Sequence, residues 1–336
     1  MIWLTWRQFR TQAWVAAAAL VVVAGALAAT APGLSDLYDR SGLAACTTGC
    51  ADLAGNFRAE VARTVAGPLY TGATALMFLL PAVVGVFWGA PLVARELEAG
   101  THRLVWSQTV TRGRWIAVKL AGVGLAAVLL AGLISLAVTW WSGPIDEASE
   151  GRITPLLFAA RGIVPLGYAA FAFLAGVLVG LLTRRTVLAM AITLLLVALV
   201  QIAMPMFVRP ALSSPVHSTT AFVPDSIREL GIHNDETISV FMRPPVEGAW
   251  TVSNRTITSS GAEFTGPVDL TKCGPDAGGG PRACEKWLGT LGLRQDISYV
   301  PADRFWTLQW RELGVFTGIT ALLSLFCVWW IRRRVA

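Results

Sequence analysis

The sequence is short of charged residues for a soluble protein. Asp, Glu, Lys and Arg together make up 14% of the 336 residues, whereas a soluble domain has about 25%. Hydrophobic residues make up 54%, and several apolar runs exceed the roughly 18 residues that a membrane-spanning helix needs. These proportions exclude an ordinary soluble domain and place most of the chain in a lipid bilayer.

Residues that often carry catalysis are also scarce. The chain has three His and three Lys, and it contains no HExxH or GxSxG motif and no metal-spaced cluster. Each Lys is followed by Leu, Cys or Trp, so a Walker A motif, which ends in Gly-Lys-Ser or Gly-Lys-Thr, is absent. We therefore expect no enzyme activity and no cofactor in this chain. Any ATP that drives it must be bound, with its Mg, by another polypeptide.

Six apolar runs predict an all-α polytopic membrane protein. We place the spanning helices at residues 13–31, 69–91, 116–141, 162–182, 186–208 and 313–331. Pro81 is expected to kink the second helix, because proline removes a backbone hydrogen bond. Arg161, directly before the fourth helix, is a candidate for lining a path through the membrane. The simpler expectation is that its side chain extends to the outer membrane surface.

The segments between the spans differ in charge. If the N-terminus is cytoplasmic, the inner segments hold 12 Lys and Arg against two Glu, and the outer segments hold 15 basic against 19 acidic residues. Cytoplasmic loops carry an excess of Lys and Arg, which predicts a cell-membrane protein with both termini in the cytoplasm. The net charge of +6 then reflects topology, and we expect no nucleic-acid partner.

The N-terminal residues 1–12 have an amphipathic pattern. Ile2, Trp6 and Phe9 fall on one helical face, and Arg7 and Arg10 lie largely off it. This pattern is typical of a helix in the plane of the lipid headgroups. The alternative is an ordinary basic flank before the first span. Residues 1–28 also resemble a signal peptide, but their apolar run is longer than usual, and we favour a retained span.

Two outer segments are long, and the second is expected to fold. Residues 209–304 are rich in Gly and Pro, and residues 249–264 alternate apolar and polar side chains with many β-branched ones. We predict one or two strands there, within a small extracellular α+β or β-rich cap. Residues 305–336 then form the last span and a basic cytoplasmic tail.

The outer segments contain four of the five cysteines, namely Cys46, Cys50, Cys273 and Cys284. An oxidising compartment favours two disulfides among them. Three pairings are possible, of which 46–50 with 273–284 is the local one, and we predict the second of these bonds. A zinc site is the competing interpretation, but the spacing does not suit one. Cys327, inside the last span, is expected to be a packing residue.

The segment between the second and third spans is charged and contains helix-breaking signals. Gly100 interrupts the helix that follows the second span, Thr101 is a good first cap, and Thr111 begins the next helix. A short helix of about residues 101–109 is predicted between them. It suits a groove on a partner protein, although a solvated basic loop is the alternative.

This segment resembles the first cytoplasmic loop of ABC type-2 exporter permeases. In that family an acidic residue precedes Gly-Thr, a short coupling helix follows, and a Ser/Thr-Arg element leads into a basic residue at the start of span three. The matching residues are Glu96, Glu98, Gly100, Thr101, Thr111, Arg112 and Lys119. Residues 299–310, "YVPADRFWTLQW", resemble an actinobacterial branch of the family. The six-span plan and the N-terminal interface helix agree with the resemblance.

The resemblance implies a permease subunit that forms a homo- or heterodimer in membrane lipids and binds a separate ABC ATPase. It would move a hydrophobic or amphipathic substrate, such as a drug, peptide or lipid, outward. The implied ATPase contact set is Glu98, Gly100, Thr101, His102, Arg103, Leu104, Trp106, Gln108 and Arg112. By polarity alone, candidates for the substrate path are Thr71, Thr74, Ser135, Thr139, Thr193 and Gln201. The alternative is a membrane-anchored sensor or adaptor whose cap binds a ligand without transport.

Overall fold

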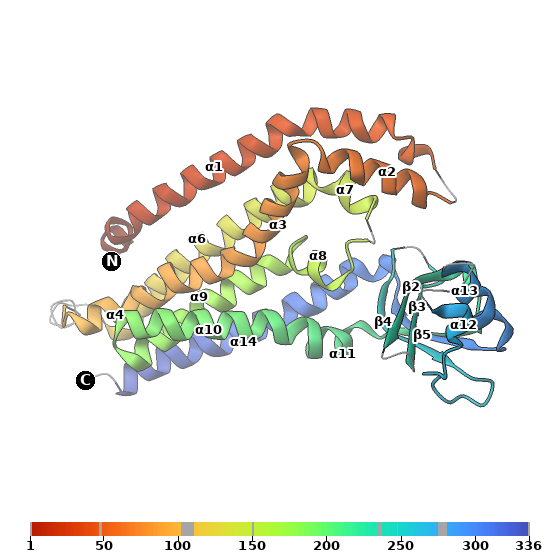
Figure 1. Ribbon diagram of the computed structural model, residues 1–336. Coiled ribbons are helices and arrows are strands. Elements are labelled where there is room, and N and C mark those ends of the chain that lie inside the picture. Colours follow the sequence, from red (N-terminus) through yellow and green to blue (C-terminus); the bar gives the residue numbers. More distant parts are fainter. Residues whose placement is uncertain are drawn as a thin grey trace. The chain divides into compact units, whose positions relative to one another are not determined.

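The computed structural model describes residues 2–46, 49–101, 111–149, 151–233, 237–246, 248–274 and 281–334. The chain divides into two compact units. The membrane unit consists of Met1–Leu212 and Phe305–Ala336, and the insert consists of Ser213–Arg304 (Figure 1). The insert therefore begins a few residues later than the sequence predicted, because residues 209–212 continue the fifth spanning helix.

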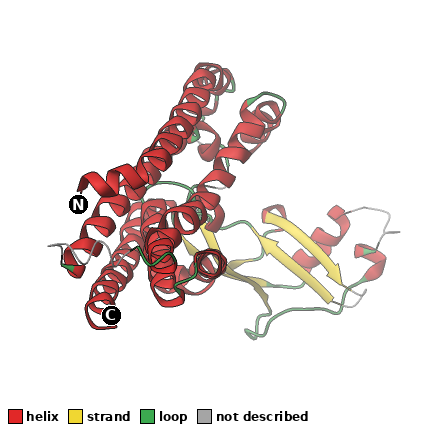
Figure 2. Ribbon diagram, turned by 90° about the vertical axis from the view of Figure 1, so that its left-hand side faces the viewer, coloured by secondary structure: helices red, strands yellow, loops and turns green. Residues whose placement is uncertain are grey.

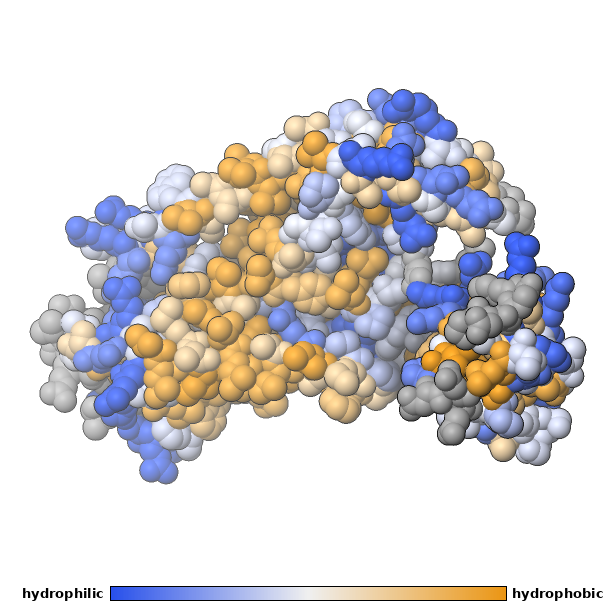
Figure 3. Space-filling model, viewed as in Figure 1, coloured by the Kyte–Doolittle hydropathy of each residue, from blue (hydrophilic) through white to orange (hydrophobic). Residues whose placement is uncertain are grey.

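The described residues include six helices long and apolar enough to cross a membrane, which confirms the predicted number. They are Trp6–Arg40, Ala66–Glu98, Arg112–Trp141, Val164–Thr183, Thr186–Ser213 and Ala302–Arg334. An apolar surface covers the middle of the membrane unit, and hydrophilic residues gather at the end that holds both chain termini (Figure 3). The last turn of the second span lies at this same end (Figure 1), as the predicted topology requires.

The membrane unit is built from helices that in places extend beyond the predicted spans. In chain order they are α1 (Ile2–Arg40), η1 (Leu43–Ala45), α2 (Ala51–Ala62), α3 (Ala66–Val83), η2 (Val84–Gly89), α4 (Ala90–Glu98), α6 (Arg112–Trp141), α7 (Gly143–Glu147), α8 (Pro155–Ala159), α9 (Val164–Thr183), α10 (Thr186–Ala203), η3 (Met204–Val208), α11 (Arg209–Ser213) and α14 (Phe305–Arg334). α9 is the most enclosed span, with two thirds of its apolar window buried.

Residues 2–12 do not form a helix separate from the first span. They are the first turns of α1, which is assigned as one helix from Ile2 to Arg40. These turns are seen end-on in Figure 1, whereas the rest of α1 runs across the view, so the helix bends near its start. The bend suits a surface-lying segment, and that placement stays a prediction.

The second span changes its helical geometry shortly after Pro81, and the predicted kink at this proline stays a prediction. The α-helix ends at Val83, and the π-helix η2 follows from Val84 to Gly89. A Cβ on Gly89 would lie 2.3 Å from the carbonyl oxygen of Phe173 in α9. A Cβ on Gly176 of α9 would in turn lie 2.4 Å from the carbonyl oxygen of Gly85. The glycines therefore allow direct backbone packing between the two spans, as small residues do in membrane helices.

The insert is a small α+β domain, which confirms the predicted sheet region. Strands β1 (Val216–Ala221), β5 (Arg294–Val300) and β4 (Trp250–Ile257) form an antiparallel sheet in the order β1-β5-β4, and β2 (Ile227–His233) pairs with β3 (Thr237–Met242). The remaining elements are η4 (Pro224–Ser226), α12 (Leu270–Cys273), α13 (Pro281–Thr290) and η5 (Ala302–Arg304). Figure 2 shows the strands gathered in this one part of the chain. Its extracellular location stays a prediction.

The side chain of Asn254 connects the two sheets of the insert. It donates a hydrogen bond to the carbonyl oxygen of Met242 at 2.7 Å and accepts one from the backbone nitrogen of that residue at 3.4 Å. Asn254 lies on β4 and Met242 ends β3, so the side-chain amide of Asn254 links the two strands by hydrogen bonds. The predicted strand in residues 249–264 is confirmed by β4.

Both local disulfides form. Cys46 is bonded to Cys50, and Cys273 is bonded to Cys284. The four sulfurs are therefore not available as zinc thiolates. Cys327 is a free thiol that is buried in α14, in keeping with its predicted packing role.

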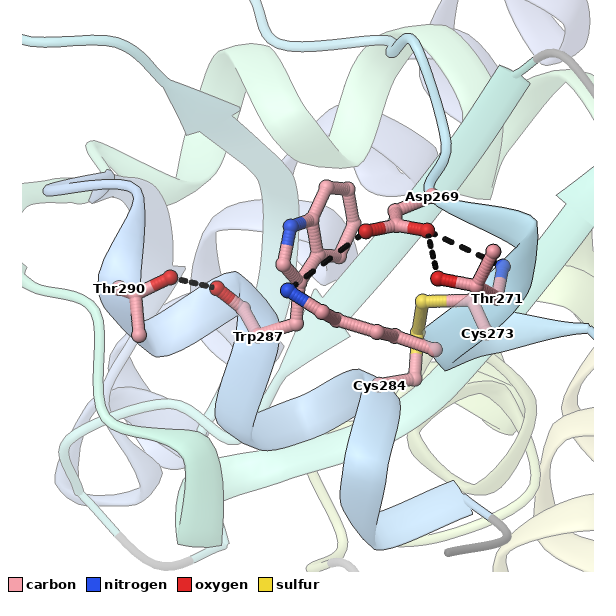
Figure 4. The surroundings of a disulfide bond; sticks show 7 residues. Asp269, Thr271, Cys273, Cys284, Trp287 and Thr290 are labelled. Atoms are coloured by element: carbon pink, nitrogen blue, oxygen red, sulfur yellow. Dashed lines mark hydrogen bonds and ion pairs between the residues drawn. A yellow bond between two sulfur atoms is a disulfide. The ribbon is translucent and has the colours of Figure 1, made fainter. Parts of the chain in front are cut away.

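The second disulfide joins α12 to α13 (Figure 4). Asp269 caps α12, because its carboxylate accepts hydrogen bonds from the backbone nitrogen and the hydroxyl of Thr271. The hydroxyl bond is the main reason that the pKa of Asp269 lies below its usual value. This cap therefore contributes to stability above the usual Asp pKa, and the contribution is lost as the pH falls through the lowered value.

Candidate functional site

The candidate site is the junction that frames residues 99–111, and its central contact is an ion pair. Lys119 of α6 lies 2.5 Å from the carboxylate of Glu96 in α4, and their side chains are only 3% and 14% exposed. Lys119 also donates to the carbonyl oxygen of Leu92 and lies over the ring of Trp115. The last turns of span two and the first turns of span three are therefore held together at the base of the segment.

Glu98 connects the same junction to the fifth span. Its carboxylate accepts hydrogen bonds from the backbone nitrogen of Thr186 at 3.0 Å and from the Thr186 hydroxyl at 2.7 Å. Thr186 is the first residue of α10, whose free N–H groups favour a nearby negative charge. The predicted ATPase-contact residue Glu98 is thus an N-terminal cap for span five, a role that the sequence did not indicate.

The first turns of α1 also meet this junction. Gln8 donates to the Glu96 carboxylate at 2.9 Å, and Gln12 donates to the carbonyl oxygen of Phe87 at 3.3 Å. The rings of Phe9 and Trp88 pack edge to face with centroids 4.8 Å apart. Helices α1, α4, α6 and α10 therefore have side-chain contacts within one or two turns of the segment.

The ends of the segment agree with the predicted helix signals. Gly100 follows α4 with φ of +69°, a left-handed conformation that glycine adopts readily at a helix end. Thr111 caps α6, which begins at Arg112, by accepting a hydrogen bond from the backbone nitrogen of Arg114. A Cβ on Gly113 would lie 2.7 Å from Nε of Arg332, so the last turn of α14 also reaches this place.

Four residues of the predicted contact set lie at the two ends of the segment: Glu98 ends α4, Gly100 and Thr101 follow it, and Arg112 begins α6. The other predicted members, His102, Arg103, Leu104, Trp106 and Gln108, lie outside the described residues, as does most of the predicted helix at 101–109. Its existence and its role in binding an ATPase stay predictions.

A second group of charges is buried within the membrane unit. Arg161 is fully buried and forms a bidentate pair with Asp146, at 2.8 and 3.3 Å. Tyr70 and Ser142 each donate to the same carboxylate at 2.7 Å. The expectation that Arg161 extends to the membrane surface was wrong, because α7 places a carboxylate beside it.

A similar pair joins the fifth and sixth spans. Arg209 in α11 is bonded to Glu312 in α14 at 2.8 and 3.1 Å, and both side chains are fully buried. Tyr168 donates to Glu312, and the Arg209 guanidinium lies over the ring of Phe158. The sequence places Arg209 at the start of the predicted cap and Glu312 just before the last predicted span. It does not predict that the two residues pair. Paired intramembrane charges of this kind face the interior of the helix bundle.

The polar residues proposed for a substrate path are all engaged in hydrogen bonds within the membrane unit. Thr74 accepts a hydrogen bond from Arg161, and Thr139 accepts one from the backbone nitrogen of Gly162. The donors are Thr71, Ser135, Thr193 and Gln201, each bonded to a backbone carbonyl. These bonds stabilise helices and helix contacts, and they do not identify a path.

Comparison with known proteins supports the family that the sequence between spans two and three resembles. The family model described as ABC-2 membrane transporter related matches residues 17–209, which is more than half of the chain. No match was found among curated proteins or solved structures. The matched region covers most of spans one and five, all of spans two to four and the whole segment between spans two and three. The chain therefore belongs to the ABC-2 membrane transporter related family and is an ABC-2 type permease.

Proposed function

We propose that this chain is the membrane-spanning subunit of an ATP-driven exporter. A separate ABC ATPase binds residues 101–109 in the cytoplasm and supplies ATP hydrolysis, and a second permease protomer completes the transporter. The cargo is a hydrophobic or amphipathic molecule that moves outward, and the insert lies outside the cell. The family supports a permease, and the absence of a Walker A motif supports a separate ATPase.

The observation that carries the mechanism is the junction around Glu96. A force applied to residues 99–111 acts directly on α4 and α6, because these helices flank the segment and share the buried Glu96–Lys119 pair. It reaches α10 through Glu98 and α1 through Gln8. ATPase closure at this segment therefore moves several spans together.

The exposed apolar faces of the spans support a membrane location and leave room for a second protomer. Val187 and Phe207, at opposite ends of the fifth span, are 80% and 70% exposed, and Val22 of α1 is 70% exposed. Such surfaces require lipid or another apolar protein surface.

The proposal is tested with the Lys119→Met variant in the complete transporter reconstituted in vesicles. Removing the cation leaves the buried Glu96 carboxylate without its counter-charge, although Gln8 still donates to it. Breaking a buried ion pair by removing one partner costs about 3–5 kcal/mol. We expect the ATPase to stay bound but ATP-driven export of an amphipathic fluorescent dye to fall by roughly tenfold or more, about 1.4 kcal/mol of coupling free energy.

The matched control is Lys272→Met, which removes a lysine that is 53% exposed in the insert. It should export the dye at the wild-type rate. If the wild-type chain binds no ATPase and transports nothing, the exporter proposal fails and the sensor or adaptor alternative takes its place. If Lys119→Met exports normally, the junction does not transmit movement.

A further inference from the structure

A cavity of about 430 Å³ lies beside the Glu96–Lys119 junction. It is partly open and is formed by the first turns of α1, the end of η2 and helix α4, together with Thr101. Its volume is within the range of roughly 300–1,000 Å³ that is typical of small-molecule sites. It also adjoins the π-helix η2, a type of segment that is frequent at functional sites.

The lining of the cavity has two chemical halves. Phe9, Trp88 and Leu92 provide an apolar wall. Gln8, Arg95 and Thr101 provide hydrogen-bond donors, and the Gln8 amide keeps a second N–H besides the one given to Glu96. The ligand that fits both halves is amphipathic, with an acceptor-rich head and an apolar chain.

The charges of the cavity select the head group. The Glu96 carboxylate is neutralised by Lys119, whereas Arg95 has no ion-pair partner in the part of the chain that the structure describes. One positive charge therefore remains for a ligand. A zwitterionic head would need a second, available carboxylate for its ammonium group, and Glu96 is the one acidic residue among the described lining residues. The head group that fits best is therefore a phosphate without an ammonium group.

We propose that this cavity binds one anionic phospholipid per chain. Its phosphate lies against Arg95, Gln8 and Thr101, and an acyl chain lies along Phe9, Trp88 and Leu92. The bound lipid fills the space between α1 and α4 and strengthens the contact of the N-terminal turns with the junction. The site goes beyond the proposed function, because lipid binding at rest requires neither the ATPase nor transport.

The test is native mass spectrometry of the delipidated full-length protein titrated with dioleoylphosphatidylglycerol. Wild-type protein should bind a first lipid tightly. Arg95→Gln, a substitution of an exposed side chain, should weaken that first binding step by about tenfold or more, which corresponds to 1.4 kcal/mol. Ala99→Trp, which places a large ring in the cavity, should remove it. The control Arg333→Gln changes an exposed arginine outside the cavity lining and should alter it less than about twofold, below 0.5 kcal/mol.

Two ligand controls separate the sources of affinity. Dioleoylglycerol, which lacks the phosphate, and inorganic phosphate, which lacks the chains, should not compete with the lipid. Equal losses in Arg95→Gln and Arg333→Gln would mean general attraction to a basic surface and would overturn the site. Undiminished first-lipid binding in a folded Ala99→Trp protein, or full competition by inorganic phosphate, would overturn it as well.

Discussion

Arg209 and Glu312 are 103 residues apart in the sequence, one shortly before the insert and one shortly after it, and they form a fully buried, bidentate ion pair. Arg311, next to Glu312, donates a further hydrogen bond to the carbonyl oxygen of Leu212 at 2.7 Å. The end of the fifth span and the start of the sixth are thus held together within the membrane unit, independently of the insert.

Glu312→Ala should strongly destabilise the membrane unit. It leaves the Arg209 guanidinium buried without a counter-charge, which costs about 3–5 kcal/mol. The double variant Arg209→Met with Glu312→Leu should regain most of the loss, because it buries no charge. Thermal unfolding in detergent measures both. Glu147→Ala removes a half-exposed partner of Arg152 at 3.8 Å and should cost less than about 1 kcal/mol. Equal losses in Glu312→Ala and Glu147→Ala would contradict the energetic role of the buried pair.

The spans and the disulfides were predictable from the sequence, whereas the buried ion pairs were not. Runs of apolar residues identify a spanning helix locally, and cysteines eleven residues apart indicate a local bond. The pairing joins Asp146 in α7 to Arg161, 15 residues later and just before the fourth span, and no local pattern encodes it. The position of Arg161 next to an apolar run indicated a special role for this residue, but identifying Asp146 as its partner required the three-dimensional structure.

The contact between the second and fourth spans had a sequence signal that was missed. Gly85 and Gly89, and likewise Gly176 and Gly180, have the GxxxG spacing of close helix pairs. The spacing does not name the partner helix, and the structure shows that these two motifs face each other.

Gly176→Ala should destabilise the membrane unit, because the new Cβ would lie 2.4 Å from the carbonyl oxygen of Gly85. The helices must separate to accept it, at an expected cost of about 1–3 kcal/mol for overpacking. Gly25→Ala in α1 is the matched control, since nothing lies within 4 Å of its Cβ position. It should be neutral or stabilise by up to about 1 kcal/mol through helix propensity. Thermal unfolding of the two variants giving the same midpoint would contradict this packing.

The insert should contain the Cys273–Cys284 bond in protein isolated without reductant. Closing a loop of this length stabilises a fold by about 3 kcal/mol in the chain-entropy model. Mass spectrometry of unreduced peptides should find this bond and Cys46–Cys50, with Cys327 as the remaining thiol. Maleimide should modify Cys327 only after unfolding, because its side chain is buried. Finding Cys273 and Cys284 as free thiols would refute the prediction.

The topology predicts which surfaces are accessible in intact cells. In a Cys327→Ala background, a cysteine at Ser260 in the insert should react with a reagent that cannot cross the membrane, and a cysteine at Arg333 should not. Both positions are exposed in the structure, so burial does not explain a difference. Permeabilised cells provide the control, in which both sites should react. Labelling at position 333 from outside would reverse the proposed orientation.

We propose that residues 101–109 bind the ATPase and that Trp106 is the anchor of that contact. Tryptophan is enriched among interface hot spots, where truncation to alanine costs about 2 kcal/mol or more. The control is Trp140→Ala, which removes an exposed tryptophan (64% exposed) near the other end of α6. Both variants should insert into the membrane at wild-type levels.

The most direct measurement is the amount of ATPase subunit that copurifies with each variant, determined by quantitative mass spectrometry. We predict wild-type recovery for Trp140→Ala. For Trp106→Ala we predict an association weakened by a factor of about 30, since 1.4 kcal/mol corresponds to tenfold. Wild-type recovery with Trp106→Ala would remove this residue as the anchor. Wild-type recovery when Leu104, Val105 and Trp106 are all changed to alanine would contradict the proposal that residues 101–109 bind the ATPase.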